Sequence, residues 1–131
     1  MLDTSLTKTV LIVEDEITLG KFMVDFLEEE LNVQTFLALT GKQALTMIGT
    51  IKPDLLLLDY RLPDMTGLDI YDRLHALDGL EGIPALVVSG DPPIKEIEQR
   101  RLSFLPKPFD LDDLLMSIQL LLEKEKVLLT V

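Results

Sequence analysis

The sequence predicts an α/β domain built on a parallel sheet. Short apolar runs alternate with amphipathic helical patterns along the chain, and three of these runs, at residues 9–13, 55–58 and 85–88, are almost continuously apolar. Such runs are typical of strands that are covered on both faces. Because helical patterns lie between the strands, we expect the strands to pair in parallel through right-handed crossovers.

The first half of the chain is expected to hold two strands and two helices. Residues 9–14 form the first buried strand, and the pattern over residues 16–30 predicts an amphipathic helix. Five apolar residues of that helix recur on one face and are assigned to the core: Leu19, Phe22, Met23, Phe26 and Leu27. Looser alternation over residues 32–38 predicts an edge strand. Thr40 is placed to cap a short helix that ends near Thr50.

The second half repeats the alternation. Residues 55–59 form a second buried strand, a helix is expected over residues 67–77, and the next strand follows Pro84. The last helix carries an apolar stripe and begins after Asp110, a suitable capping residue.

Composition narrows the function. The 131 residues fit one domain, and 47% of them are hydrophobic, which is enough for a core without cross-links. The absence of cysteine excludes disulfides, zinc–thiolate sites and cysteine nucleophiles, and a single histidine, His75, excludes a histidine-rich metal site. A formal net charge of −11 disfavours direct binding to nucleic acid. With no apolar run of membrane-spanning length and no signal-peptide pattern, we expect a cytoplasmic protein.

Polar side chains suited to phosphoryl chemistry stand where the buried strands end. Glu14 and Asp15 follow the first of these strands, Asp59 ends the second, Ser89 follows the third, and Lys107 lies between two prolines further on. Because the carboxyl ends of parallel strands meet at one edge of a sheet, we expect these side chains to converge. Carboxylates, a hydroxyl and an ammonium in one pocket suit a hard divalent cation together with a phosphoryl group.

Two segments, residues 59–67 (DYRLPDMTG) and residues 105–109 (LPKPF), carry a resemblance to a known family. With the strand-end acids they resemble the receiver domain of two-component response regulators, over about residues 9–125. The resemblance implies a flavodoxin-like five-stranded parallel sheet in the order 2-1-3-4-5, with helices on both faces. Residues 1–8 are then an N-terminal extension, and residues 126–131 an apolar C-terminal tail.

The resemblance also implies that Asp59 is a phosphoacceptor. It would take a phosphoryl group from a histidine kinase or a phosphotransfer protein, become an aspartyl phosphate, and so switch the domain's conformation to control a partner. The transfer would depend on Mg²⁺, with Asp15, Asp59 and the backbone carbonyl of Arg61 as direct ligands and Glu14 acting through water. Taken alone, Asp59 could instead be a turn residue, and the acids at 14 and 15 could be helix-start residues favoured by the macrodipole.

Two further residues are implied to contact the phosphoryl group. Ser89 would donate its hydroxyl to one oxygen and Lys107 would pair with another. Ser89 and Phe104 would form the switch, the ring turning inward when the serine moves. A turn serine, a solvated lysine and a permanently buried phenylalanine are the alternatives. The Lys107–Pro108 peptide bond is expected to be cis, as is typical of the family.

Arg61 and Asp91 are placed at the rim of the site, two residues past the phosphoacceptor and past Ser89. Opposite charges could meet there across the mouth, and two separately solvated side chains are an equal alternative. Between Ser89 and Lys107 the chain is about one helical turn shorter than is usual in the family. The fourth helix, confined to about residues 94–101, is therefore expected to be short or missing.

Three classes of function stay open. The leading hypothesis is a signalling domain that catalyses only its own phosphorylation and dephosphorylation, and so is not an enzyme. A pseudo-receiver that only binds a partner is a second, although the intact Asp15, Asp59, Ser89 and Lys107 argue against it. A phosphatase with an aspartyl nucleophile usually has a second aspartate two residues on, where this chain has Arg61. A homodimer remains an open alternative to a monomer.

Overall fold

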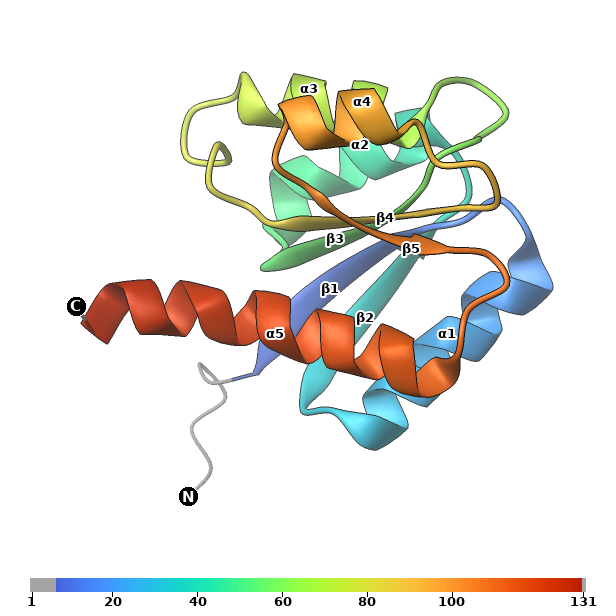
Figure 1. The fold of residues 1–131 in the computed structure, drawn as a ribbon. Helices are drawn as coiled ribbons and strands as arrows, with labels where there is room; N and C mark the ends of the chain where they lie inside the picture. The colour runs from blue at the N-terminus through green and yellow to red at the C-terminus, as the bar shows by residue number, and fades with distance from the viewer. Residues whose placement is uncertain (1–6, 131) are drawn as a thin grey trace.

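A computed structural model describes the backbone of residues 7–130 and the side chains of residues 7–123. Five parallel strands form one sheet in the order β2-β1-β3-β4-β5 (Figure 1). The strands are β1 (Lys8–Val13), β2 (Val33–Ala38), β3 (Leu55–Asp59), β4 (Ala85–Ser89) and β5 (Ser103–Pro106). The helices are α1 (Ile17–Glu30), α2 (Gly41–Ile51), α3 (Gly67–His75), α4 (Ile94–Gln99) and α5 (Leu111–Thr130). The flavodoxin-like strand order predicted from the sequence is confirmed.

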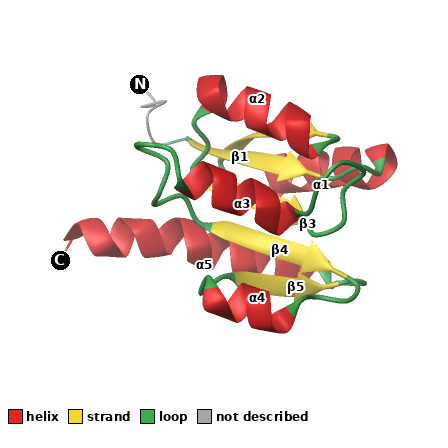
Figure 2. Ribbon diagram, turned by 90° about the horizontal axis from the view of Figure 1, so that it is seen from above, coloured by secondary structure: helices red, strands yellow, loops and turns green. Residues whose placement is uncertain are grey.

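Helices cover both faces of the sheet, as predicted. α1 and α5 lie on one face, and α2, α3 and α4 lie on the other (Figure 1, and from above in Figure 2). The observed elements begin and end close to the predicted positions, the helix expected to reach Leu77 ending at His75. Thr40 caps α2 as expected, since its hydroxyl oxygen accepts a hydrogen bond from the Gln43 amide at 3.0 Å.

The leucine run of β3 serves two hydrophobic cores at once. Side chains of a strand alternate between faces, so Leu55 and Leu57 pack with α1 and α5, while Leu56 and Leu58 pack with α2 and α3. Each is 0 or 1% exposed, and burying one such side chain stabilises the fold by about 1.5–3 kcal/mol. A continuous apolar run, rather than an alternating one, follows from having a helix layer on each face.

Polar bonds fix the start of β3 against β1. The Asp54 carboxylate accepts a hydrogen bond from the Thr9 amide at 2.8 Å, and the Asp54 amide donates to the Thr9 carbonyl at 2.8 Å. The parallel pairing then starts with Val10 opposite Leu55.

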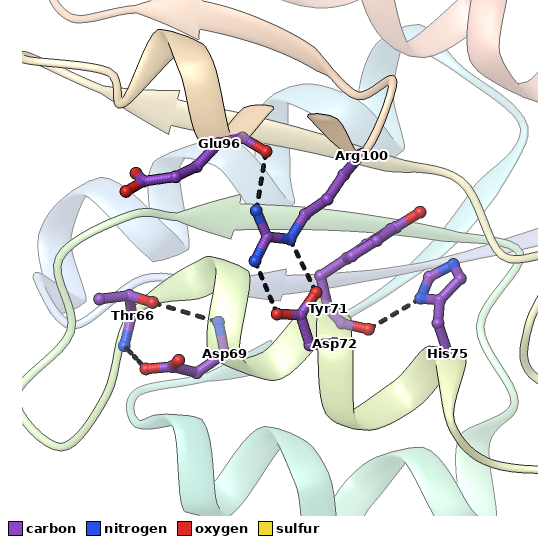
Figure 3. A network of polar contacts seen from close by, with 7 residues as sticks. All are labelled: Thr66, Asp69, Tyr71, Asp72, His75, Glu96 and Arg100. Carbon is purple, nitrogen blue, oxygen red and sulfur yellow. Dashed lines mark hydrogen bonds and ion pairs between the residues drawn. The ribbon is translucent and has the colours of Figure 1, made fainter. Parts of the chain in front are cut away.

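The fourth helix is short, as predicted. α4 has six residues and buries one of them, Ile97, against Leu68 and Val87. An ion pair just beyond its end joins it to α3: the guanidinium of Arg100 donates to both oxygens of Asp72, each at 2.7 Å (Figure 3). A further bond from Arg100 to the Glu96 carbonyl, at 2.8 Å, holds the side chain over its own helix.

The described backbone begins just before β1 and ends with α5. β1 begins at Lys8, and most of the predicted extension, residues 1–8, lies outside the described residues. The backbone of α5 runs through Thr130, so the predicted tail is helical where it is described. None of the helices within residues 7–130 combines the length and apolar character needed to cross a membrane.

Candidate functional site

The carboxyl ends of four strands bring the predicted site residues to one edge of the sheet. Glu14 directly follows β1, Asp59 ends β3, Ser89 ends β4 and Lys107 directly follows β5. The parallel pairing of β1 with β3, β3 with β4 and β4 with β5 aligns these ends. Ligands bind at this edge in open α/β sheets.

Three carboxylates form a cluster at this edge. Glu14, Asp15 and Asp59 each offer one oxygen, and these oxygens lie within 4.8 Å of one another. Glu14 is 2% exposed and Asp59 8% exposed, whereas Asp15 faces solvent. A set of carboxylate oxygens without sulfur or imidazole is the chemistry that Mg²⁺ and Ca²⁺ prefer, so the residues present fit a hard divalent cation.

Lys107 provides the positive charge of the cluster. Its ammonium lies 3.1 Å from the Glu14 carboxylate and 3.4 Å from that of Asp59. Burial acts to lower the pKa of Lys107, but the charges of Asp59 and Glu14 outweigh it and raise the pKa above its ordinary value of 10.5. The lysine therefore stays charged and bridges two strand ends that are far apart in the sequence.

Burial makes the two inner acids weaker acids. The pKa of Asp59 lies above its ordinary value of 3.8, because the effect of burial exceeds the opposing effect of Lys107. Burial also raises the pKa of Glu14 above 4.5, against a hydrogen bond that its carboxylate accepts from the Glu16 amide at 3.1 Å. The pocket holds more negative charge than its one ammonium neutralises, which favours the entry of a further cation.

Ser89 lies beside the lysine. It is 4% exposed, its carbonyl accepts a hydrogen bond from the Lys107 amide at 2.8 Å, and its hydroxyl oxygen accepts one from the Asp91 amide at 3.1 Å. The Lys107–Pro108 peptide bond is cis, as predicted.

The two predicted rim residues and the predicted switch aromatic are exposed, whereas the other switch residue, Ser89, is buried. Phe104 on β5 is 40% exposed, so the alternative of a permanently buried ring is wrong for this structure. Arg61 and Asp91 both face solvent. Within the described side chains, residues 7–123, no ion pair joins these two residues. The structure therefore agrees with two separately solvated rim side chains.

The family of the chain follows from its sequence. The sequence model of the response regulator receiver domain matches residues 10–119. This chain is a receiver domain. It therefore belongs to two-component signalling, whose receiver domains partner with histidine kinases or phosphotransfer proteins.

The similar proteins include one that this chain covers almost entirely and one that is much longer. The receiver is 30% identical over 113 residues to sporulation initiation phosphotransferase F of Bacillus subtilis, covering 83% of this chain and 89% of the relative. It is 45% identical over 78 residues to the aerobic respiration control sensor protein ArcB of Escherichia coli, covering 60% of this chain and 10% of that longer protein. A CheY-like receiver domain structure from Methanospirillum hungatei superimposes with a TM-score of 0.83 at 26% identity, covering 92% of this chain and 97% of that one.

One assignment made from the sequence is wrong. Phe22 shares the helical face of Leu19 and Met23, which predicts a core position, yet it is 47% exposed. Its ring stacks on Phe26 at a centroid distance of 6.2 Å. Helical period alone does not separate the middle of an apolar stripe from its edge, and Phe22 lies at the edge.

The exposed ring belongs to an apolar groove beside the receiver's lysine. The groove has a volume of about 500 Å³. Its lining comes from two parts of the chain. One is α1, with Leu19 and Phe22, and the other is the segment from Lys107 onward, with Lys107, Pro108, Phe109 and Leu111. The wall shared with Lys107 places this apolar surface next to the acidic cluster.

Proposed function

We propose that this receiver accepts a phosphoryl group on Asp59, transferred in a Mg²⁺-dependent step from a histidine kinase or a phosphotransfer protein. The observation that supports it most is the position of the Asp59 carboxylate, buried at a strand end with two other carboxylates and the Lys107 ammonium around it. In the proposed step an oxygen of Asp59 forms a bond to phosphorus while the bond from phosphorus to the donor's imidazole nitrogen breaks. The electron pair of the broken bond stays on that nitrogen.

The cation would be held by residues of the loops around this carboxylate. We propose Asp15, Asp59 and the backbone carbonyl of Arg61 as direct ligands, with Glu14 acting through water. When bound, Mg²⁺ offsets the negative charge that gathers where a phosphoryl group meets a carboxylate. The all-oxygen donor set and the excess negative charge of the pocket support this assignment.

Three other residues would respond to the new phosphoryl group. Lys107 would pair with one of its oxygens, exchanging its present carboxylate partners for a more strongly charged one. Ser89 would donate its hydroxyl to another oxygen, and Phe104, now exposed, would turn into the space that the serine leaves. Arg61 and Asp91 would flank the path of the water that hydrolyses the aspartyl phosphate.

The groove beside Lys107 is proposed as the docking surface for the phosphodonor protein. A protein that delivers a phosphoryl group to Asp59 must contact the surface next to the acidic cluster, and the apolar surface formed by Phe22 and Phe109 lies there. Exposed aromatic side chains are enriched at protein interfaces because they bury much area with few rotatable bonds.

The phosphorylation assay tests the acceptor. With acetyl phosphate and Mg²⁺, the intact protein is expected to gain the mass of one phosphoryl group, and Asp59→Asn is expected to gain none. Asp78→Asn, which changes an exposed acid in the loop before β4, serves as the matched control and should be labelled like the wild type. Undiminished labelling of Asp59→Asn would overturn the assignment, and labelling that is unaffected by a chelator would overturn the cation's part in it.

The same assay with a protein donor tests the groove. A phosphorylated histidine phosphotransfer domain that labels the wild type should label Phe22→Glu more slowly, while acetyl phosphate labels both at the same rate. Equal slowing with both donors would mean that Phe22→Glu disturbs the acidic cluster itself and would contradict a docking role.

Other properties stay predictions. The cytoplasmic location, the lack of direct nucleic-acid contacts and the restriction of catalysis to the receiver's own phosphorylation and dephosphorylation rest on the expectations from sequence. Failure of acetyl phosphate labelling in the wild type would favour the pseudo-receiver alternative, and a homodimer would be detected by its mass in solution.

A further inference from the structure

One side chain, Asp64, ties the loop between β3 and α3 to a neighbouring helix. Asp64 lies near the tip of this loop, and its two oxygens accept hydrogen bonds from the backbone amides of Gly41 and Lys42, both at 2.9 Å. These are the first two amides of α2, and they have no partner within their own helix. The bonds from Lys42 and Gly41 also hold the pKa of the Asp64 carboxyl below its ordinary value. The carboxylate thus joins segments that are more than 20 residues apart in the sequence.

An apolar contact joins the same two segments. A Cβ atom placed on Gly41 would overlap the side chain of Met65, so the loop lies directly against the first turn of α2. Glycine at this position permits that close approach, because a side chain there would displace the side chain of Met65 from α2. Together, Asp64 and Met65 seat the loop tip on the helix.

Hydrogen bonds within the loop connect its tip to the main chain at Arg61. The Leu62 amide donates to the Met65 carbonyl at 3.2 Å, which closes the turn that contains Asp64. Arg61 pairs with Thr66 in an antiparallel bridge, so the segments that enter and leave the loop are held together. A contact that fixes the tip therefore also restrains the backbone at Arg61.

We propose that Asp64 is a positioning residue for the divalent cation: by fixing the loop to α2, it holds the backbone carbonyl of Arg61 where the ion can use it. The inference rests on the proposed function, which makes that carbonyl a ligand. Asp64 itself does not touch the ion. Residues that orient metal ligands typically change metal affinity by about 10–100-fold when they are replaced.

A helix cap with no further role is the competing explanation, and the same helix supplies a control for it. Thr40 caps α2 through the Gln43 amide, at 3.0 Å, and in the described part of the chain its side chain forms no hydrogen bond to the loop. Thr40→Ala should therefore destabilise α2 by an amount similar to Asp64→Ala, without freeing the loop. Only the positioning role predicts different effects of the two variants on the ion.

Isothermal titration of the unphosphorylated protein with Mg²⁺ measures the difference. We expect Asp64→Ala to weaken Mg²⁺ binding by on the order of 10-fold and Thr40→Ala to leave it unchanged. Asp64→Asn keeps the side-chain volume and one acceptor oxygen, so its affinity should lie between those of Asp64→Ala and the wild type. Amide hydrogen exchange gives a second readout: Asp64→Ala should speed exchange at Leu62 as well as at Gly41, and Thr40→Ala should speed it at Gln43 alone.

The outcomes separate this inference from the proposed function. Equal Mg²⁺ affinity of Asp64→Ala and the wild type would overturn the positioning role and leave the cation site in place, as would equal weakening by Thr40→Ala. A wild type that binds no Mg²⁺ would overturn the cation site and this inference with it. If Asp64→Ala does not fold, Asp64→Asn decides, because an affinity equal to the wild type would contradict the loss of one of two bonds.

Discussion

Asp59 ends a strand whose other four residues are leucines, so its carboxylate is buried with them. A charge in this position is unfavourable for folding unless a partner compensates it, and Lys107 compensates both Asp59 and Glu14 at once. The raised pKa of Asp59 records that the compensation is incomplete. Asp59, which the proposed chemistry needs, therefore lowers the stability of the fold.

Two substitutions are therefore expected to change the stability of the fold in opposite directions in a metal-free buffer. Asp59→Asn should raise stability by on the order of 1 kcal/mol, or about 4 °C in melting temperature, because it removes a charge that is not fully compensated. Lys107→Met should lower the melting temperature, since it leaves two buried acids without their cation. Thermal unfolding followed by circular dichroism measures both, and a destabilised Asp59→Asn would contradict the incomplete compensation.

At the scale of residues, the sequence could predict the acids because they stand at or just after the ends of recognisable strands. It could predict the lysine because Lys107 lies between two prolines in the LPKPF segment. It could not predict the role of Asp64, whose partners lie 23 and 22 residues earlier and are backbone amides, which leave no trace in the sequence. The spacing of Phe22 is that of a core residue, so the sequence pattern predicts the wrong position for it. The positions of Asp64 and Phe22 are determined by contacts between separate segments of the chain, which the residue pattern within a single segment does not show.

At the scale of elements, α4 departs most from its neighbours. Six residues with one buried side chain make a helix that depends on outside contacts, and the bidentate pair of Arg100 with Asp72 of α3 is the strongest polar one (Figure 3). The hydrogen bonds from Arg100 hold the pKa of Asp72 below its ordinary value of 3.8. Because the folded state lowers this pKa, the pair stabilises the fold above that value and loses its effect as the pH falls through the lowered pKa.

The pair should therefore show a pH-dependent effect. At about pH 7, Asp72→Asn is expected to reduce stability by less than about 1 kcal/mol, since the pair is partly exposed. The difference from the wild type should shrink as the pH falls from 3.8, the ordinary pKa of the carboxyl in the unfolded chain, through the lowered pKa of Asp72 in the folded protein. Melting curves of the wild type, Asp72→Asn, Arg100→Gln and the double variant measure it, and strictly additive effects of the two substitutions would mean that the pair is not coupled.

The short fourth helix was predictable because Asp91, Pro92 and Pro93 take up part of the chain available between β4 and β5. The end of the helix was not predictable from the sequence. Arg101 adopts a left-handed backbone conformation with φ of 56°, a position at which glycine is usual, and the Leu102 amide donates back to the Ile97 carbonyl at 3.1 Å. An arginine there gives no signal of a helix end.

At the scale of the whole molecule, one sheet separates two layers of helices, and the acidic cluster lies at the edge where its five parallel strands end. An ion that binds only the folded state stabilises the whole fold, so Mg²⁺ should raise the melting temperature in a concentration-dependent way. Asp15→Ala should remove most of this response, while Asp25→Ala, a matched exposed acid on α1, should keep it. A melting temperature that does not respond to Mg²⁺ in the wild type would contradict the cation site.

The four leucines of β3 also bear on how Asp59 reaches its place. If β3 slid by one residue against its neighbours, most of its side chains would be exchanged for identical ones, so hydrophobic burial hardly distinguishes the two alignments. The distinction must come from the ends of the strand, and at the start it comes from the paired bonds of Asp54 with Thr9. The alignment that brings Asp59 to one edge of the sheet thus depends on an aspartate at the opposite edge, Asp54, whose hydrogen bonds with β1 are made there.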